Sequence, residues 1–164
     1  LLYQYEVKTE EGRLLEYTVY PKETIQKPVP GKEFWYAYLV VTDPLPWFNN
    51  QAYGDTLNKE AVEAFLKEGY EPYAKRLEKE FSRTIPSIFT DEPQFSKMEC
   101  MHTIKEAEEI GIPFTESLES RFLEICQTSL LKRLPELFWL KKDGSISRLR
   151  YQYGNLLSAQ FAEN

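Results

Sequence analysis

The chain is poor in histidine and cysteine and has no glycine-rich phosphate loop, and each scarcity excludes a class of chemistry. His102 is the only histidine, so a metal site that needs two imidazoles from this chain is excluded. Cys100 and Cys126 are the only cysteines, and two thiols alone build neither a zinc site nor an iron–sulfur cluster. The seven glycines are scattered and form no GxGxxG or P-loop pattern, which argues against nucleotide chemistry in this segment.

Basic clusters and long apolar runs are missing as well. Lys and Arg number 20 against 26 Asp and Glu, so the net charge is −6. An acidic chain binds nucleic acid weakly, because contacts of Lys and Arg with phosphates supply most of that affinity. No apolar run approaches the roughly 20 residues that span a bilayer. We therefore expect neither a nucleic-acid nor a membrane partner. The chain opens on a strand-like run without an initiator Met, so we expect a piece of a longer chain whose cellular location stays open.

Aromatic residues are abundant, with 11 Tyr, 10 Phe and 3 Trp among 164 residues. Most of them belong to a core, and a length of 164 residues favours one domain, since domains have roughly 150 residues. An excess beyond the needs of a core fits a surface that stacks on flat, polar-edged ligands such as sugars.

The order of strands and helices predicts the fold class. Residues 1–20 alternate as in a β-hairpin with a turn at Glu11-Gly12, and 21–33 form a proline-rich connector. Residues 34–41 are almost continuously apolar, which is typical of a strand covered on both faces. A helix is predicted from Asn58, with a kink at Pro72, and a strand at 84–90. Three more helices are predicted: one at 99–110, one that begins at Thr115 or Ser117, and one that begins at Ser145 or Ser147.

Strand, helix, strand and helix in succession indicate βαβ units and a parallel sheet. A complete (β/α)8 barrel needs about 250 residues. We therefore predict an α/β protein with two parts. Residues 1–33 form a hairpin insertion and its connector, and residues 34–164 form a partial (β/α)8, TIM-type barrel.

Acidic residues follow both predicted strands. Asp43 comes after the first strand, and Asp91-Glu92 comes after the second. Sites in parallel α/β folds are built at the carboxyl ends of strands, so we expect these carboxylates at one mouth. The alternative is that Asp91 caps a turn at Pro93 and Glu92 is merely solvated.

An aromatic and amide-rich loop follows the first of these strands. Trp47, Phe48, Asn49 and Tyr53 suit a sugar, whose ring faces are apolar and whose edges carry hydroxyls. Asp55 precedes the helix and is expected to cap or orient it. In the alternative interpretation, buried Trp47 and Phe48 only pin the loop in place.

Two motifs resemble a known family. The stretch from Tyr53 through Asp55-Thr56-Leu57-Asn58 and the stretch Ile85-Pro86-Ser87-Ile88-Phe89-Thr90-Asp91-Glu92-Pro93 are similar to segments of α-L-rhamnosidase-like glycoside hydrolases of bacteria, whose catalytic domain is a TIM barrel. The resemblance covers residues 34–164. It departs from the family at Ser87, where a glycine is usual, and at Gly54, where a hydrophobic residue is usual.

The resemblance implies hydrolysis of glycosidic bonds, with Glu92 as the catalytic carboxylate and Asp91 as its neighbour or a substrate ligand. Glycoside hydrolysis commonly uses two carboxyls, one of them protonated. The resemblance implies no organic cofactor, and calcium is possible in the whole enzyme although no Asp/Asn-rich calcium loop is visible. We expect this segment alone to be inactive, because a partner carboxylate is missing from it.

A second hypothesis belongs to another class. The chain would be a non-catalytic carbohydrate-binding or interaction domain in which Trp47, Phe48 and Tyr53 bind the ligand. If the chain is instead a partial barrel, its exposed strand edges favour self-association.

Overall fold

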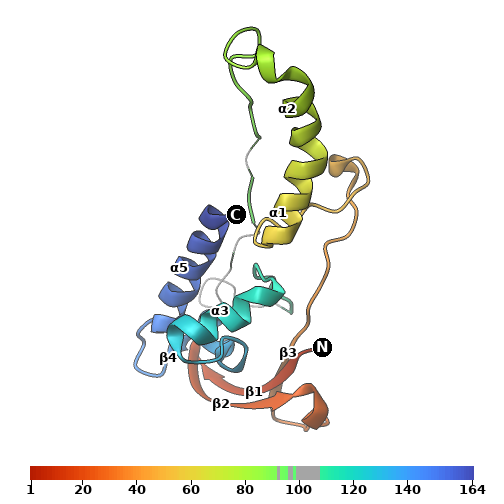
Figure 1. Cartoon of the computed structure of the whole chain (residues 1–164). Coiled ribbons are helices and arrows are strands. Elements are labelled where there is room, and N and C mark those ends of the chain that lie inside the picture. The colour runs from red at the N-terminus through yellow and green to blue at the C-terminus, as the bar shows by residue number, and fades with distance from the viewer. Residues whose placement is uncertain (92, 96–97, 99–107) are drawn as a thin grey trace. The chain divides into compact units, whose positions relative to one another are not determined.

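The computed structural model of the chain describes residues 1–91, 93–95, 98 and 108–164. It shows a mixed α/β protein with a four-stranded sheet in the order β3-β1-β2-β4 (Figure 1). The strands are β1 (Tyr3–Glu10), β2 (Arg13–Pro21), β3 (Glu33–Ala37) and β4 (Leu140–Lys141). The α-helices are α1 (Lys59–Phe65), α2 (Glu71–Leu77), α3 (Glu116–Cys126), α4 (Pro135–Phe138) and α5 (Arg148–Glu163).

The chain forms two compact units. The first unit comprises Leu1–Thr42 and Ser96–Ala159 and contains the sheet, α3, α4 and most of α5. The second unit comprises Asp43–Phe95 and Gln160–Asn164 and contains α1, α2 and the end of α5. In the described ranges, no helix has both the length and the apolar character needed to cross a membrane.

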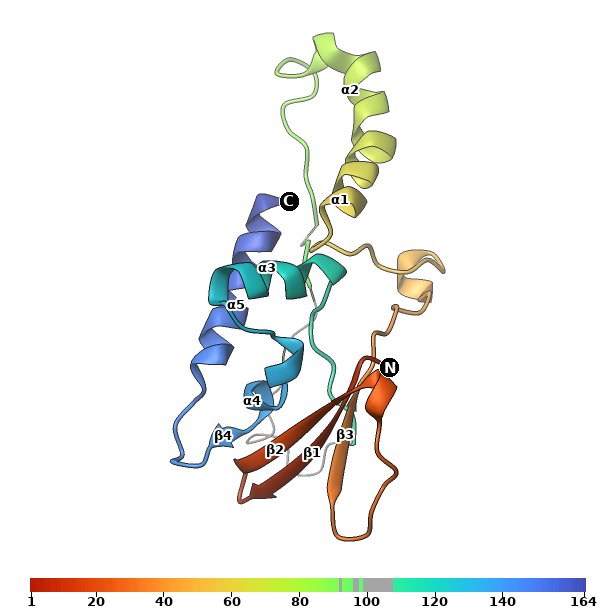
Figure 2. The ribbon, with the colours of Figure 1, turned by 60° about the horizontal axis from the view of Figure 1, so that its bottom comes forward.

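The predicted N-terminal hairpin is confirmed. β1 pairs antiparallel with β2, and the turn residues Glu11 and Gly12 have φ angles of 47° and 77°. Positive φ at both central residues is the geometry that twists with the flanking strands, and Gly12 adopts it without steric cost. A bulge between Lys8 and Thr9 shifts the register near the turn. Figure 2 shows β1, β2 and β3 side by side.

The core of the first unit lies against one face of the sheet. Tyr5 and Val7 of β1 are buried on that face, and the Tyr5 hydroxyl donates to the Leu131 carbonyl at 2.6 Å. Trp35 of β3 meets the buried Trp139 edge to face, with ring centroids 5.5 Å apart. The helices contribute further fully or nearly fully buried side chains, namely Leu118, Phe122, Leu137, Leu149, Tyr153, Leu156 and Leu157.

The predicted partial barrel is wrong. β1 pairs antiparallel with both β2 and β3, and the parallel pairing of β2 with β4 joins only two residues of each strand. The apolar run 34–41 is a strand only as far as Ala37, and the predicted strand 84–90 contributes a single bridge, Phe81 to Ile85. The sheet is therefore mixed and open. A run of apolar residues indicates burial but does not specify the partner strand, and here the nearby hairpin supplies the partner of β3.

The predicted helix after Asn58 is confirmed in its start and its interruption. The Asn58 side chain accepts a hydrogen bond from the Ala61 amide at 3.3 Å and so caps α1. A π turn at Leu66–Tyr70 separates α1 from α2, which carries Pro72 in its first turn. Neither helix has a buried residue, and Phe65 and Tyr73 are 60% and 65% exposed. Most of the helix predicted at 99–110 lies outside the described residues.

Candidate functional site

Of the two proposed catalytic residues, the structure describes one. Asp91 is exposed and lies on a segment without regular secondary structure, whereas Glu92 lies outside the described residues. Asp43 is also exposed and follows an irregular stretch rather than the end of a strand. Cys100 and His102 are outside the described residues as well. Neither Asp43 nor Asp91 therefore lies at the end of a parallel strand. Hydrogen bonds of its neighbours hold the backbone around Asp91 instead.

Both ends of the segment Thr90–Gln94, here called the acid-bearing segment, are anchored. At one end, the Thr90 hydroxyl lies 3.1 Å from the hydroxyl of Tyr70. At the other end, the Gln94 amide donates to the Tyr53 hydroxyl at 3.2 Å, and the Thr56 hydroxyl donates to the Gln94 carbonyl at 2.9 Å. Asp91 lies between these anchors.

The loop that holds Gln94 is itself built around a short turn and one buried side chain. The Asp55 carboxylate accepts from the Leu57 amide at 3.0 Å, an Asx turn that leads into α1. Leu57 is only 2% exposed, and its carbonyl accepts from the Gln160 side chain at 2.7 Å. The carbonyl of Thr56 accepts from Asn164 at 3.3 Å. Asp55 therefore orients the helix start, as expected of a residue in that position.

The aromatic loop is a closed turn that presents Trp47 to solvent. Its ends pair through the Leu45 amide and the Gln51 carbonyl at 3.2 Å, and a 3-10 turn covers Pro46–Phe48. Asn49 and Asn50 have φ angles of 56° and 57°, a left-handed conformation that Asn tolerates better than most residues. Trp47 is 88% exposed, so it is not a buried pin. The loop thus supplies an accessible aromatic face beside amide side chains.

Tyr53 connects the aromatic loop to the acid-bearing segment. Its ring packs against Phe48 with centroids 5.0 Å apart, while its hydroxyl accepts the hydrogen bond from the Gln94 amide. One side chain thereby orients an aromatic neighbour of Trp47 and the backbone that follows Asp91. Tyr53, one of the residues singled out from sequence, therefore contacts both Phe48 of the aromatic loop and Gln94 of the acid-bearing segment.

Sequence reasoning did not single out a polar cluster in the first unit, around Glu136 of α4. The Glu136 carboxylate accepts hydrogen bonds from the Tyr17 hydroxyl at 2.9 Å and from the Ser147 hydroxyl at 2.7 Å. Arg133 adds a two-pronged contact through Nε at 2.8 Å and Nη2 at 2.7 Å. In the sequence, the only indication of this cluster is that Arg133 and Glu136 are three residues apart, a spacing at which opposite charges on a helix can pair.

This cluster is structural in its chemistry. Burial alone would raise the pKa of Glu136, but the hydrogen bonds from Arg133, Ser147 and Tyr17 together outweigh it and lower the pKa to about 2. Four donors already occupy the acceptor sites of the carboxylate, so it has no capacity left for a substrate proton. Burial and the bond to Glu136 raise the pKa of Tyr17 to about 12.

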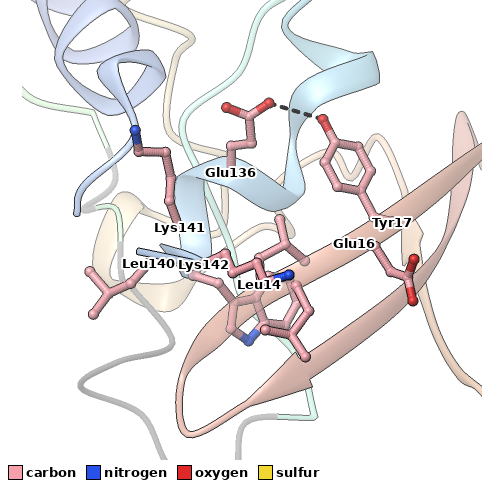
Figure 3. A pocket seen from close by; sticks show the side chains of 9 residues that line it. Leu14, Glu16, Tyr17, Glu136, Leu140, Lys141 and Lys142 are labelled. Carbon is pink, nitrogen blue, oxygen red and sulfur yellow. Dashed lines mark hydrogen bonds between the residues drawn. The ribbon is translucent and has the colours of Figure 1, made fainter. Parts of the chain in front are cut away.

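Beside this cluster lies a hollow of about 340 Å³ between β2 and the segment around β4 (Figure 3). Its lining is mostly apolar and includes the polar side chains of Glu136, Tyr17, Lys141 and Lys142. The volume is at the lower end of the range found for ligand pockets, roughly 300–1,000 Å³.

The described ranges place no group of three or more His, Cys, Asp or Glu side chains where they would hold a metal ion. Comparison with family models, with curated proteins and with solved structures gives no match to the chain.

Proposed function

We propose that the chain is part of a glycoside hydrolase in which the acid-bearing segment presents the carboxylates of Asp91 and Glu92 to the sugar. The observation that supports this most strongly is the clamp of Tyr53 and Thr56 on Gln94. It joins the first motif that resembles glycoside hydrolases to the residue directly after the second, across 41 positions of sequence from Tyr53 and 38 from Thr56. A carboxylate used in catalysis must be held in place by its surroundings, and the anchors on the two sides of Asp91, at the Thr90 hydroxyl and at the Gln94 backbone, provide such support.

In this proposal Glu92 acts as the general acid. It donates its proton to the glycosidic oxygen as the bond from that oxygen to the anomeric carbon breaks. A water molecule adds to the anomeric carbon and loses its proton to a second carboxylate, acting as base. Asp91 accepts hydrogen bonds from sugar hydroxyls. The proposal places the second carboxylate outside residues 1–164, so we expect these residues alone to show no turnover.

A second candidate function is non-catalytic carbohydrate binding, and the exposure of Trp47 favours it. An aromatic side chain that is 88% exposed on a closed loop offers a face on which a pyranose ring stacks. Asn49 and the neighbouring amides supply donors and acceptors for hydroxyl groups. This function needs no carboxylate chemistry, so the two candidates predict different responses to the same variants.

The test uses the protein as it is naturally produced, assayed on a panel of nitrophenyl glycosides that includes α-L-rhamnoside. We expect Glu92→Gln to lower kcat by a factor of roughly a thousand or more, because the amide cannot deliver a proton. Trp47→Ala is expected to raise KM by about tenfold with kcat nearly unchanged, since stacking binds the substrate in the ground state. Glu124→Gln, at an exposed position of α3, is the matched control for a lost carboxylate.

Each result decides between the two functions. A near-normal kcat in Glu92→Gln overturns the catalytic assignment. If the protein hydrolyses none of the glycosides but binds oligosaccharides in a way that Trp47→Ala abolishes, the binding function replaces the hydrolase.

A further inference from the structure

β2 has an open edge. β1 pairs with β2 along the length of both strands, whereas β4 pairs only with Arg13 and Leu14 on the other side. In the part of the chain that the structure describes, residues 16–21 of β2 have no second neighbouring strand. Such an edge presents unpaired backbone N–H and C=O groups and is a template for another strand.

The hollow described above overlaps the start of this edge, at Glu16 and Tyr17 (Figure 3). Leu14 and Leu15 of β2 line it together with Trp139 and Leu140. Lys141 and Lys142 stand at the end where β4 stops. The hollow therefore fits an added strand that inserts an apolar side chain and carries an acidic residue just beyond it.

The same chain contains a segment with these properties. Tyr38, Leu39, Val40 and Val41 continue the line of β3 past its last paired residue and are 60%, 46%, 75% and 81% exposed. Aromatic and β-branched residues of this kind have high strand propensity. Asp43 follows two positions later and supplies the negative charge.

We propose that two copies of the chain associate by adding residues 38–41 of each copy to the β2 edge of the other. Antiparallel pairing with residues 16–21 brings Asp43 to the end of the edge where Lys141 and Lys142 stand. In the proposed dimer the exchange is reciprocal about a two-fold axis, so each copy both gives its segment and receives that of the other. It stands apart from the proposed hydrolase function, because none of its residues except Asp43 belongs to the candidate site.

Two short ladders bury less surface than the roughly 800 Å² per partner of a standard interface, so the dimer is expected to be weak. The experiment is sedimentation velocity of the chain from about 10 μM to 1 mM, which spans dissociation constants of that order. We expect the sedimentation coefficient to rise with concentration from that of a monomer to that of a dimer.

Two sets of variants test the surface itself. Leu39→Lys with Val40→Lys places a charge on each face of the segment and is expected to raise the dissociation constant at least tenfold. The matched control is Ile88→Lys with Phe89→Lys, two consecutive apolar residues that are 57% and 82% exposed in the second unit. The control is expected to change the dissociation constant less than twofold.

A charge exchange then tests the pairing direction. Lys142→Glu alone and Asp43→Lys alone are each expected to weaken the dimer, and the two together are expected to restore it. A chain that stays monomeric at every concentration overturns the proposal. So does an equal loss of association in the two double-lysine variants, or a charge exchange that restores nothing.

Discussion

The two units of the molecule differ in the interactions that stabilise each of them internally. The first unit packs aromatic and aliphatic side chains between a sheet and helices. In the second unit, Leu57 is the only buried apolar side chain among the described residues. Hydrogen bonds to backbone atoms of Thr56, Leu57 and Gln94 organise its loops instead. The chain thus concentrates its apolar burial in one unit and its candidate site in the other, a division common where loops carry function.

The largest effect is expected from removing a core side chain of the first unit. Phe122 of α3 is fully buried, so Phe122→Ala loses apolar burial and leaves a cavity that costs about 3–5 kcal/mol of unfolding free energy. Phe65→Ala, at a position of α1 that is 60% exposed, is expected to cost less than about 1 kcal/mol. Urea denaturation followed by circular dichroism measures both. Equal losses would contradict the difference between the units.

A smaller effect is expected at Glu136. Glu136→Gln removes the charge that Arg133, Ser147 and Tyr17 all bond to, at a cost of about 2 kcal/mol. The pKa of Glu136 is lowered from its ordinary value of 4.5 to about 2, so the unfolded chain takes up a proton first as the solution is acidified. Its contribution is therefore complete above about pH 5 and is lost as the pH falls toward 2.

The measurement is the free energy of unfolding in urea at several pH values between 7 and about 3, a range that brackets most of this titration. The Glu136→Gln curve should fall less steeply than that of the natural chain, and the two should converge at low pH. Glu124→Gln on exposed α3 is the control and should follow the natural chain. Parallel curves for Glu136→Gln and the natural chain would show that the carboxylate is not held in its ionised form.

The smallest effect is expected in the second unit and should remain local. Tyr53→Phe removes the hydroxyl that accepts from the Gln94 amide while keeping the ring against Phe48. Loss of one such bond is worth about 1 kcal/mol, so hydrogen exchange at the Gln94 amide should accelerate by about fivefold. Tyr73→Phe, at a position 65% exposed, is the control. An unchanged exchange rate would show that Tyr53 does not hold the acid-bearing segment.

Local signals in the sequence were sufficient for several elements. Glu11-Gly12 marks the hairpin turn, Asn58 caps α1, and Ser147 accepts from the Leu149 amide at the start of α5. Each of these depends on residues within a few positions of one another. Turn chemistry and capping are decided at that range, so a single sequence suffices to predict them.

The long-range pairings were not predictable in the same way. β4 joins β2 across more than a hundred residues, and nothing in Leu140-Lys141 marks a strand. The apolar run 34–41 indicated a strand buried on both faces, but only its first part pairs, and Val41 is 81% exposed. In the candidate site, the residue types at 53–58 and 90–94 were identifiable. The contact of Tyr53 with Gln94 became visible only in the fold.

The placement of the three tryptophans has a consequence for spectroscopy. Trp35 and Trp139 are in edge-to-face contact within the first unit, whereas Trp47 stands in water in the second. We expect the buried indole of Trp139 to emit at shorter wavelength and its pairing with Trp35 to give a near-ultraviolet dichroism band, whereas the exposed indole of Trp47 should emit further to the red and be quenched by iodide. Without any added label, the blue part of the emission therefore reports the integrity of the sheet and its helices, and quenching of the red part reports what covers the aromatic loop.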